Sequence, residues 1–133
     1  RMAGQAGRVN YNAIPSVIYT SPEVAVVGLT EAEAREKGHE VAVGVFPFQA
    51  NGRAVAGGHA DGLAKLIADK ASGRVLGAQI LSANASELIA EAVLLMELGG
   101  SAEDLARTIH AHPTMSEGLR EAAHIATGEP LHM

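Results

Sequence analysis

The sequence predicts an α+β domain in which an antiparallel sheet of about five strands is covered by helices. Short runs of β-branched and alternating apolar residues occupy the chain as far as about residue 81, and apolar residues at helical spacing follow them. Strands grouped before helices favour this class over an alternating parallel fold. With 133 residues, of which 47% are hydrophobic, the chain can bury one core, and we find no repeat or internal domain boundary.

Five runs of the sequence have the composition of strands. They are residues 17–19, 24–27, 41–45, 63–68 and 75–81. Ser-Pro-Glu at residues 21–23 is a turn signal between the first two runs, and residues 69–74 are expected to form a hairpin loop between the last two. Residues 50–58 are small and rich in glycine, so we expect them to be irregular.

The first predicted helix covers residues 30–37, because Thr30 and Glu33 have the spacing of a capping box and Gly38 can end the helix. Residues 85–98 form the longest predicted helix, with Glu87 and Glu91 on a polar face. Its apolar stripe belongs to the core or to a dimer interface and consists of Leu88, Ile89, Leu95 and Met96.

Two further helices are predicted near the C-terminus. Ser101 and Asp104 can cap a short helix that runs to residue 108. Thr114 is expected to open the last helix, with Met115, Leu119, Ala122 and Ala126 on one stripe, and Gly128 is expected to close it.

Composition excludes several classes of function. A net charge of −5 without a basic patch argues against nucleic-acid binding, and no apolar run approaches the ~20 residues that a membrane span needs. No cysteine is present, so any thiol–disulfide chemistry must use cysteines elsewhere. The spacing of His, Asp and Glu predicts no metal site, and the glycines at residues 52–58 do not form a dinucleotide-binding fingerprint. His39, His59, His124 and His132 are expected on the surface.

The stretch His-Ala-His-Pro-Thr-Met-Ser-Glu at residues 110–117 carries the most chemical information. A histidine titrates near neutral pH, and a nearby carboxylate can orient it, so His112 and Glu117 are candidates for a general acid/base pair. From the residues alone, His112 can also be an ordinary loop histidine. Glu117 can be the second half of a capping box with Thr114, and one carboxylate can serve both roles with one oxygen for each.

These eight residues resemble the signature near the C-terminus of the dihydrolipoamide dehydrogenase family, a group of pyridine nucleotide-disulfide oxidoreductases. The resemblance extends from about residue 12 to residue 128. It includes the stretches Ile-Pro-Ser-Val-Ile-Tyr-Thr-Ser-Pro-Glu-Val-Ala at 14–25, Val-Gly-Leu-Thr-Glu at 27–31, Ala-Asn-Gly-Arg-Ala at 50–54 and Val-Leu-Gly-Ala at 75–78. It implies that residues 12–133 form the C-terminal interface, or dimerisation, domain and that residues 1–11 are the remnant of a preceding FAD-domain segment.

The resemblance also implies a function. The family oxidises dihydrolipoamide with NAD through FAD and a redox disulfide. In that scheme His112 is the acid/base, Glu117 is its orienting partner, and the pair enters the active site of the other subunit of a homodimer. The backbone of His112 and Pro113 would lie beside the partner's flavin, with a cis peptide between the two residues. His110 would be structural or adjacent to the flavin rather than catalytic.

For the intact parent, the resemblance implies FAD and NAD as cofactors and a lipoyl domain of a 2-oxo acid dehydrogenase complex as the partner that presents dihydrolipoamide. It implies the cytoplasm of a bacterium or the mitochondrial matrix of a eukaryote. The chain by itself should hold no cofactor. Two alternatives stay open: an interface domain from a glutathione-reductase-like enzyme, which Met115 and Gly118 disfavour, and an association module without chemistry of its own.

Overall fold

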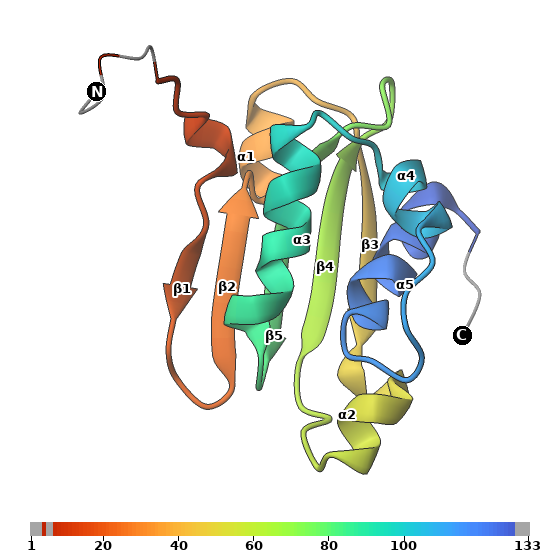
Figure 1. Cartoon of the computed structure of the whole chain (residues 1–133). Coiled ribbons are helices and arrows are strands. Elements are labelled where there is room, and N and C mark those ends of the chain that lie inside the picture. The colour runs from red at the N-terminus through yellow and green to blue at the C-terminus, as the bar shows by residue number, and fades with distance from the viewer. Residues whose placement is uncertain (1–3, 5–6, 130–133) are drawn as a thin grey trace.

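The computed structural model describes residue 4 and residues 7–129. One antiparallel sheet has the strand order β1-β2-β5-β4-β3 (Figure 1). The strands are β1 (Ser16–Ile18), β2 (Glu23–Gly28), β3 (Val41–Pro47), β4 (Leu63–Asp69) and β5 (Val75–Ser82). The predicted α+β class and the predicted sheet are therefore confirmed. Residues 1–3 and 5–6 of the segment 1–11, interpreted above as the remnant of another domain, lie outside the described residues, as does His132.

Four of the five described α-helices lie on one face of the sheet. Figure 1 shows α3, α4 and α5 crossing this face, with α2 below them. The helices are α1 (Glu31–Glu36), α2 (Gly52–Ala56), α3 (Ala85–Glu97), α4 (Ala102–Arg107) and α5 (Glu117–Thr127), with short 3-10 turns η1 (Tyr11–Ala13) and η2 (Phe48–Ala50). On the opposite face, Ala34 of α1 packs with Val41 and Ile67 in a smaller cluster.

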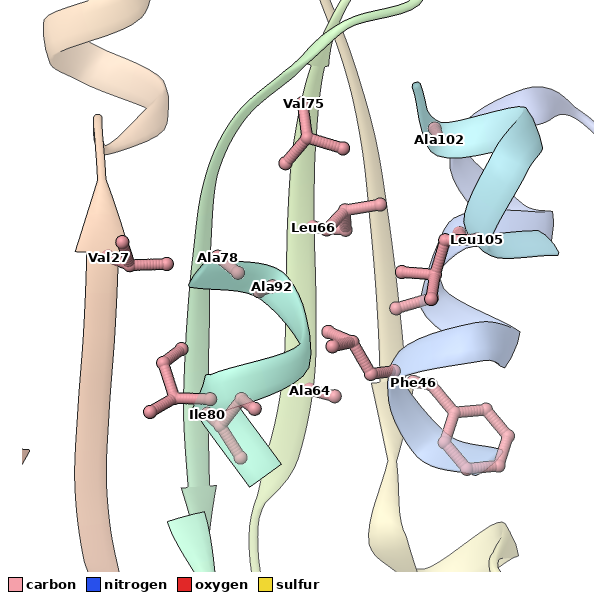
Figure 2. Packing of buried hydrophobic residues seen from close by; sticks show 14 of the residues in the cluster. Val27, Phe46, Ala64, Leu66, Val75, Ala78, Ile80, Ala92, Ala102 and Leu105 are labelled. Carbon is pink, nitrogen blue, oxygen red and sulfur yellow. The ribbon is translucent and has the colours of Figure 1, made fainter. Parts of the chain in front are cut away.

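The main core lies between the sheet and this helical layer. Figure 2 shows side chains from four strands pointing into the same space, among them Val27, Ile80, Leu66 and Phe46. Alternate residues of each strand share a face, so the period-2 pattern of the sequence places these residues under the helices. Leu105 of α4 closes the layer over them.

Two capping boxes predicted from sequence are present and set where their helices begin. The Thr30 side chain accepts from the Glu33 N–H while Glu33 accepts from the Thr30 N–H, and Ser101 and Asp104 do the same for α4. Gly128, with φ 83°, ends α5 as expected.

The prediction of an irregular segment at residues 50–58 is wrong. Residues 52–56 form the short helix α2, because the Asn51 side chain accepts a hydrogen bond from the Ala54 N–H at 2.9 Å and caps it. The glycine content of this stretch favoured an irregular prediction, although Asn51 is a residue type that commonly caps helices.

α5 is packed on more than one side, since β3, β4 and α4 all contact it. No Cβ separates β3 from the helix at Gly44, where an added Cβ would lie 1.8 Å from the Ala122 carbonyl oxygen. This wide burial explains why the surface prediction for His124 is wrong: both of its ring nitrogens are buried and have no hydrogen-bond partner among the described residues. Glu121, one turn before it, is also buried.

Candidate functional site

The candidate site is the connection between α4 and α5, residues 108–116, together with the first turn of α5. It has no regular secondary structure, and the peptide bond between His112 and Pro113 is cis, as the resemblance implies. Side chains from α2, α3 and α5 determine its shape.

His112 and Glu117 are in direct contact. His112 Nδ1 lies 2.9 Å from Glu117 Oε1, and the His112 side chain is 80% exposed while that of Glu117 is 17% exposed. An ionised carboxylate can only accept, so Nδ1 carries the proton in this contact. In the neutral ring Nε2 then has a free lone pair that points away from Glu117. The pair has the arrangement of an oriented base.

The second oxygen of Glu117 holds the backbone. Oε2 accepts from the Thr114 N–H at 2.8 Å, so one carboxylate serves both roles, as the sequence allowed. The prediction that Thr114 opens the last helix is wrong. The Thr114 hydroxyl donates to the Ala111 carbonyl at 2.7 Å instead of accepting from Glu117, and the helix begins at Glu117 with Ser116 as its N-cap.

Glu117 is held in its charged form by its surroundings. Partial burial raises the pKa of this carboxyl, but the Thr114 N–H, the His112 ring and the charge of Arg120 lower it by more, so the net pKa lies below its usual value. Its place in the first turn of α5 acts in the same direction, because the helix N-terminus favours negative charge. Glu117 is thus an anion that can orient an imidazole.

Asn51 holds the site from the side of α2. Its amide Nδ2 donates to the Thr114 carbonyl at 3.0 Å, while its Oδ1 caps α2. Thr114 is therefore fixed through both its N–H and its C=O. Asn51 was not among the site residues predicted from sequence. The one signal that could have found it is an asparagine directly before a short helix.

His110 is held on the other side of the segment. Its side chain is 6% exposed, its Nδ1 lies 3.0 Å from the Thr108 carbonyl oxygen, and its Nε2 lies 2.7 Å from Glu91 Oε1 on α3. These contacts favour the structural role that was one of the two expected for His110. The sequence placed Glu91 on a polar helix face but did not connect it to His110, which is 19 residues away.

The remaining sequence candidates do not join this site. His39 lies beside Asp69 at 3.2 Å, and His59 is exposed. Within residue 4 and residues 7–129, no group of three His, Asp or Glu side chains could hold a metal ion, and no helix combines the length and apolar character that a bilayer crossing requires.

The pair lies on the open surface. A hollow between α2, the start of α3 and the 113–116 segment is lined by Arg53, His59 and Glu87, but His112 does not line it. The chain therefore presents an oriented imidazole without enclosing a substrate pocket around it.

Comparison with known proteins agrees with the fold and with the motif. Residues 14–123 match the family described as the pyridine nucleotide-disulphide oxidoreductase dimerisation domain. The chain is 51% identical over its whole length to dihydrolipoyl dehydrogenase of Cupriavidus necator, covering 28% of that protein. Over 96% of its length it is 55% identical to the mitochondrial dihydrolipoyl dehydrogenase of Dictyostelium discoideum, covering 26% of it. The chain thus spans about a quarter of the length of these curated relatives.

Solved structures show the same architecture. The HOCl-induced flavoprotein disulfide reductase RclA of Escherichia coli matches with a TM-score of 0.86 and 31% identity, over 93% of this chain and 29% of that one. LpdA of Mycobacterium tuberculosis matches in fold, with a TM-score of 0.84 and 23% identity over 92% of this chain and 27% of that one. The resemblance drawn from the motifs is confirmed, and the chain belongs to the family of pyridine nucleotide-disulphide oxidoreductase dimerisation domains.

Proposed function

We propose that this chain is the dimerisation domain of a dihydrolipoyl dehydrogenase and that it supplies His112 and Glu117 as an acid/base pair to the active site of a partner subunit. The observation that carries the proposal is the contact of 2.9 Å between His112 Nδ1 and Glu117 Oε1, with the opposite face of the ring exposed. The curated relatives at 51% and 55% identity support the choice of reaction.

The chemical role of His112 is to move one proton. A thiol attacks a disulfide only as its thiolate, so dihydrolipoamide must lose a proton before its sulfur can react. In the proposed mechanism His112 Nε2 accepts this proton, the thiolate sulfur bonds to one sulfur of the redox disulfide, and the other sulfur of the disulfide leaves as a thiolate. Glu117 stabilises the imidazolium that forms at His112.

The remaining parts of the site must come from elsewhere in the parent enzyme. The chain has no cysteine, so the redox disulfide lies outside it. FAD would receive the electrons from the reduced disulfide and pass them to NAD. The described structure fits a flavin at one edge only: His112 and Pro113 are exposed, and no described group donates to the His112 carbonyl, so this backbone is open to a flavin of the partner. We expect the isolated chain to bind neither cofactor and to have no redox activity.

A surface beside the site supports dimer formation. Leu94, Leu98 and Ile109 are large, exposed apolar side chains, and the first two share a face of α3 with Glu91. We expect the chain to form a homodimer through this side, and sedimentation at micromolar concentration measures it. A monomer would argue against self-association of the chain alone. In the cell we expect the parent in the cytoplasm of a bacterium or in the matrix of a mitochondrion, with a lipoyl domain of a 2-oxo acid dehydrogenase complex as its partner.

The decisive experiment uses the intact flavoenzyme that contains this chain. NAD reduction by dihydrolipoamide is measured for the wild type, for His112→Ala, and for His39→Ala as a histidine control remote from the site. General acid/base catalysis typically contributes about 10²–10⁴-fold, so we expect a loss of that order for His112→Ala only, with FAD still bound.

Two other results would change the assignment. Near-normal turnover by His112→Ala would refute the acid/base role. A wild type inactive with dihydrolipoamide but active with glutathione disulfide would move the parent to the glutathione-reductase-like alternative.

A further inference from the structure

His110 is enclosed between two groups that can only accept hydrogen bonds. Its Nδ1 faces the Thr108 carbonyl at 3.0 Å, its Nε2 faces the Glu91 carboxylate at 2.7 Å, and 6% of its side chain is exposed. A neutral imidazole has one N–H and can satisfy only one of these acceptors. Both contacts are met at once only when each ring nitrogen carries a proton. His112 differs, because it has one such partner and an open second nitrogen.

The position of His110 in the chain gives this contact its importance. Residues 108–116 have no helix or strand of their own, and His112 lies midway between two anchored residues. On one side Asn51, the N-cap of α2, holds the Thr114 carbonyl, and on the other side Glu91 of α3 holds the His110 ring.

We propose that Glu91 and His110 act as a positioning pair that fastens the segment carrying His112 to α3 and so fixes where the His112 ring is presented. The inference rests on the function proposed above. Neither residue touches the reacting atoms in this proposal. Misplacement of a catalytic group by about 1 Å can cost up to ~10²-fold in rate, so an anchor two residues away acts through geometry.

Loss of Glu91 would leave His110 enclosed with one of its two acceptors missing. A buried hydrogen-bonding group that loses its partner is unfavourable, so the ring must rotate or move. Either change frees residues 109–112 from α3. We expect Thr114 to become more mobile as well. Its N–H donates to Glu117, so weaker protection of this N–H from hydrogen exchange would reveal the change.

The test compares Glu91→Ala with Glu91→Gln in the intact flavoenzyme, with Glu97→Ala as the control. Glu97 is an exposed carboxylate on the same helix and has no ion pair among the residues the structure describes. The substrate is dihydrolipoamide, and reduction of an artificial dye by NADH serves as a reaction that does not need His112.

We expect Glu91→Ala to lower kcat for dihydrolipoamide about 10-fold with KM and the dye reaction unchanged, because the base is misplaced rather than removed. The pH midpoint of kcat/KM should stay where it is in the wild type. Glu91→Gln keeps an oxygen that accepts from Nε2, so it should restore most of the rate.

Amide hydrogen exchange at Thr114 tests the positioning pair independently of the acid/base role proposed for His112. We expect exchange about 10-fold faster in Glu91→Ala and unchanged in Glu97→Ala. If His112→Ala is active but Glu91→Ala exchanges faster at Thr114, the acid/base role fails and the positioning pair stands. If His112→Ala is inactive but Glu91→Ala has wild-type turnover and exchange, the positioning pair is refuted. If Glu91→Ala does not fold, wild-type turnover and wild-type exchange at Thr114 in His110→Gln refute the positioning pair.

Discussion

Substitution of Gly44 by alanine should separate α5 from the sheet. A Cβ at Gly44 would lie 1.8 Å from the Ala122 carbonyl oxygen and 2.7 Å from the Ala126 nitrogen, and real Cβ contacts essentially never fall below 3.0 Å. The difference between 3.0 and 1.8 Å requires a movement of about 1.2 Å. Both obstacles are backbone atoms of a helix, so no side-chain rotation can relieve the clash.

The energetic cost follows from this movement. A gap of about 0.5–1 Å removes a quarter to a half of the dispersion energy across a contact, and overpacking alone typically costs about 1–3 kcal/mol. Leu119, Ala122 and Ala123 are the fully buried residues of α5 that would lose contact. We therefore expect Gly44→Ala to lower the free energy of unfolding by about 3 kcal/mol, which corresponds to a Tm about 10 °C lower for a domain of this size.

Urea unfolding of the chain, followed by circular dichroism, measures this loss. Gly52→Ala is the matched control, because no atom lies within 4 Å of a Cβ at Gly52 and alanine favours the helix that starts there. We expect the control to be neutral or up to about 1 kcal/mol more stable. If the free energy of unfolding of Gly44→Ala lies within about 0.5 kcal/mol of the wild-type value, the direct packing of α5 on β3 is wrong.

Two further predictions concern the anchors and the caps. Asn51→Ala should lower the free energy of unfolding, measured in urea, by about 2–3 kcal/mol, because α2 loses its cap and the Thr114 carbonyl loses its donor. The control is Asn84→Ala, which should cost little because the Asn84 side chain makes no cap hydrogen bond. An equal loss in both variants would refute the role of Asn51. Hydrogen bonds from Thr30 and Ser101 lower the pKa of Glu33 and Asp104 below the ordinary 4.5 and 3.8, so their stabilisation is present above about pH 4.5 and is lost as pH falls through the lower folded values. A Glu33→Gln, Asp104→Asn double variant should therefore lose less unfolding free energy than the wild type between pH 7 and pH 3, and an identical loss would contradict this.

The sheet and most helix ends could be predicted because their causes are local. Alternation along β3 and β5 and the capping boxes at Thr30 and Ser101 depend on residues two to four positions apart. The same local reasoning identified His112 and Glu117, which are five residues apart, as candidates. It also anticipated that the Glu117 carboxylate could bond the His112 ring with one oxygen and the Thr114 N–H with the other.

What could not be predicted depends on contacts between distant segments. Asn51 reaches Thr114 across 63 residues and Glu91 reaches His110 across 19, and no local pattern records either partner. Thr114 was misassigned as a helix start because its hydroxyl has a competing acceptor at Ala111. His124 was misassigned because β3, β4 and α4 all contact α5, and a single apolar stripe does not reveal that more than one side of the helix is covered.

The exposed position of His112 makes the chemistry of this domain separable from its architecture during evolution. The His112 side chain is 80% exposed, and its ring is hydrogen-bonded to a carboxylate that keeps a second hydrogen bond to Thr114. A lineage can therefore replace His112 at little cost to folding and retain the domain for assembly alone. Replacement of Glu117 is more constrained, because the same residue also holds the turn that begins α5. Under the proposed function, His112 should be under selection for catalysis only, whereas Glu117 should be under selection for both folding and catalysis.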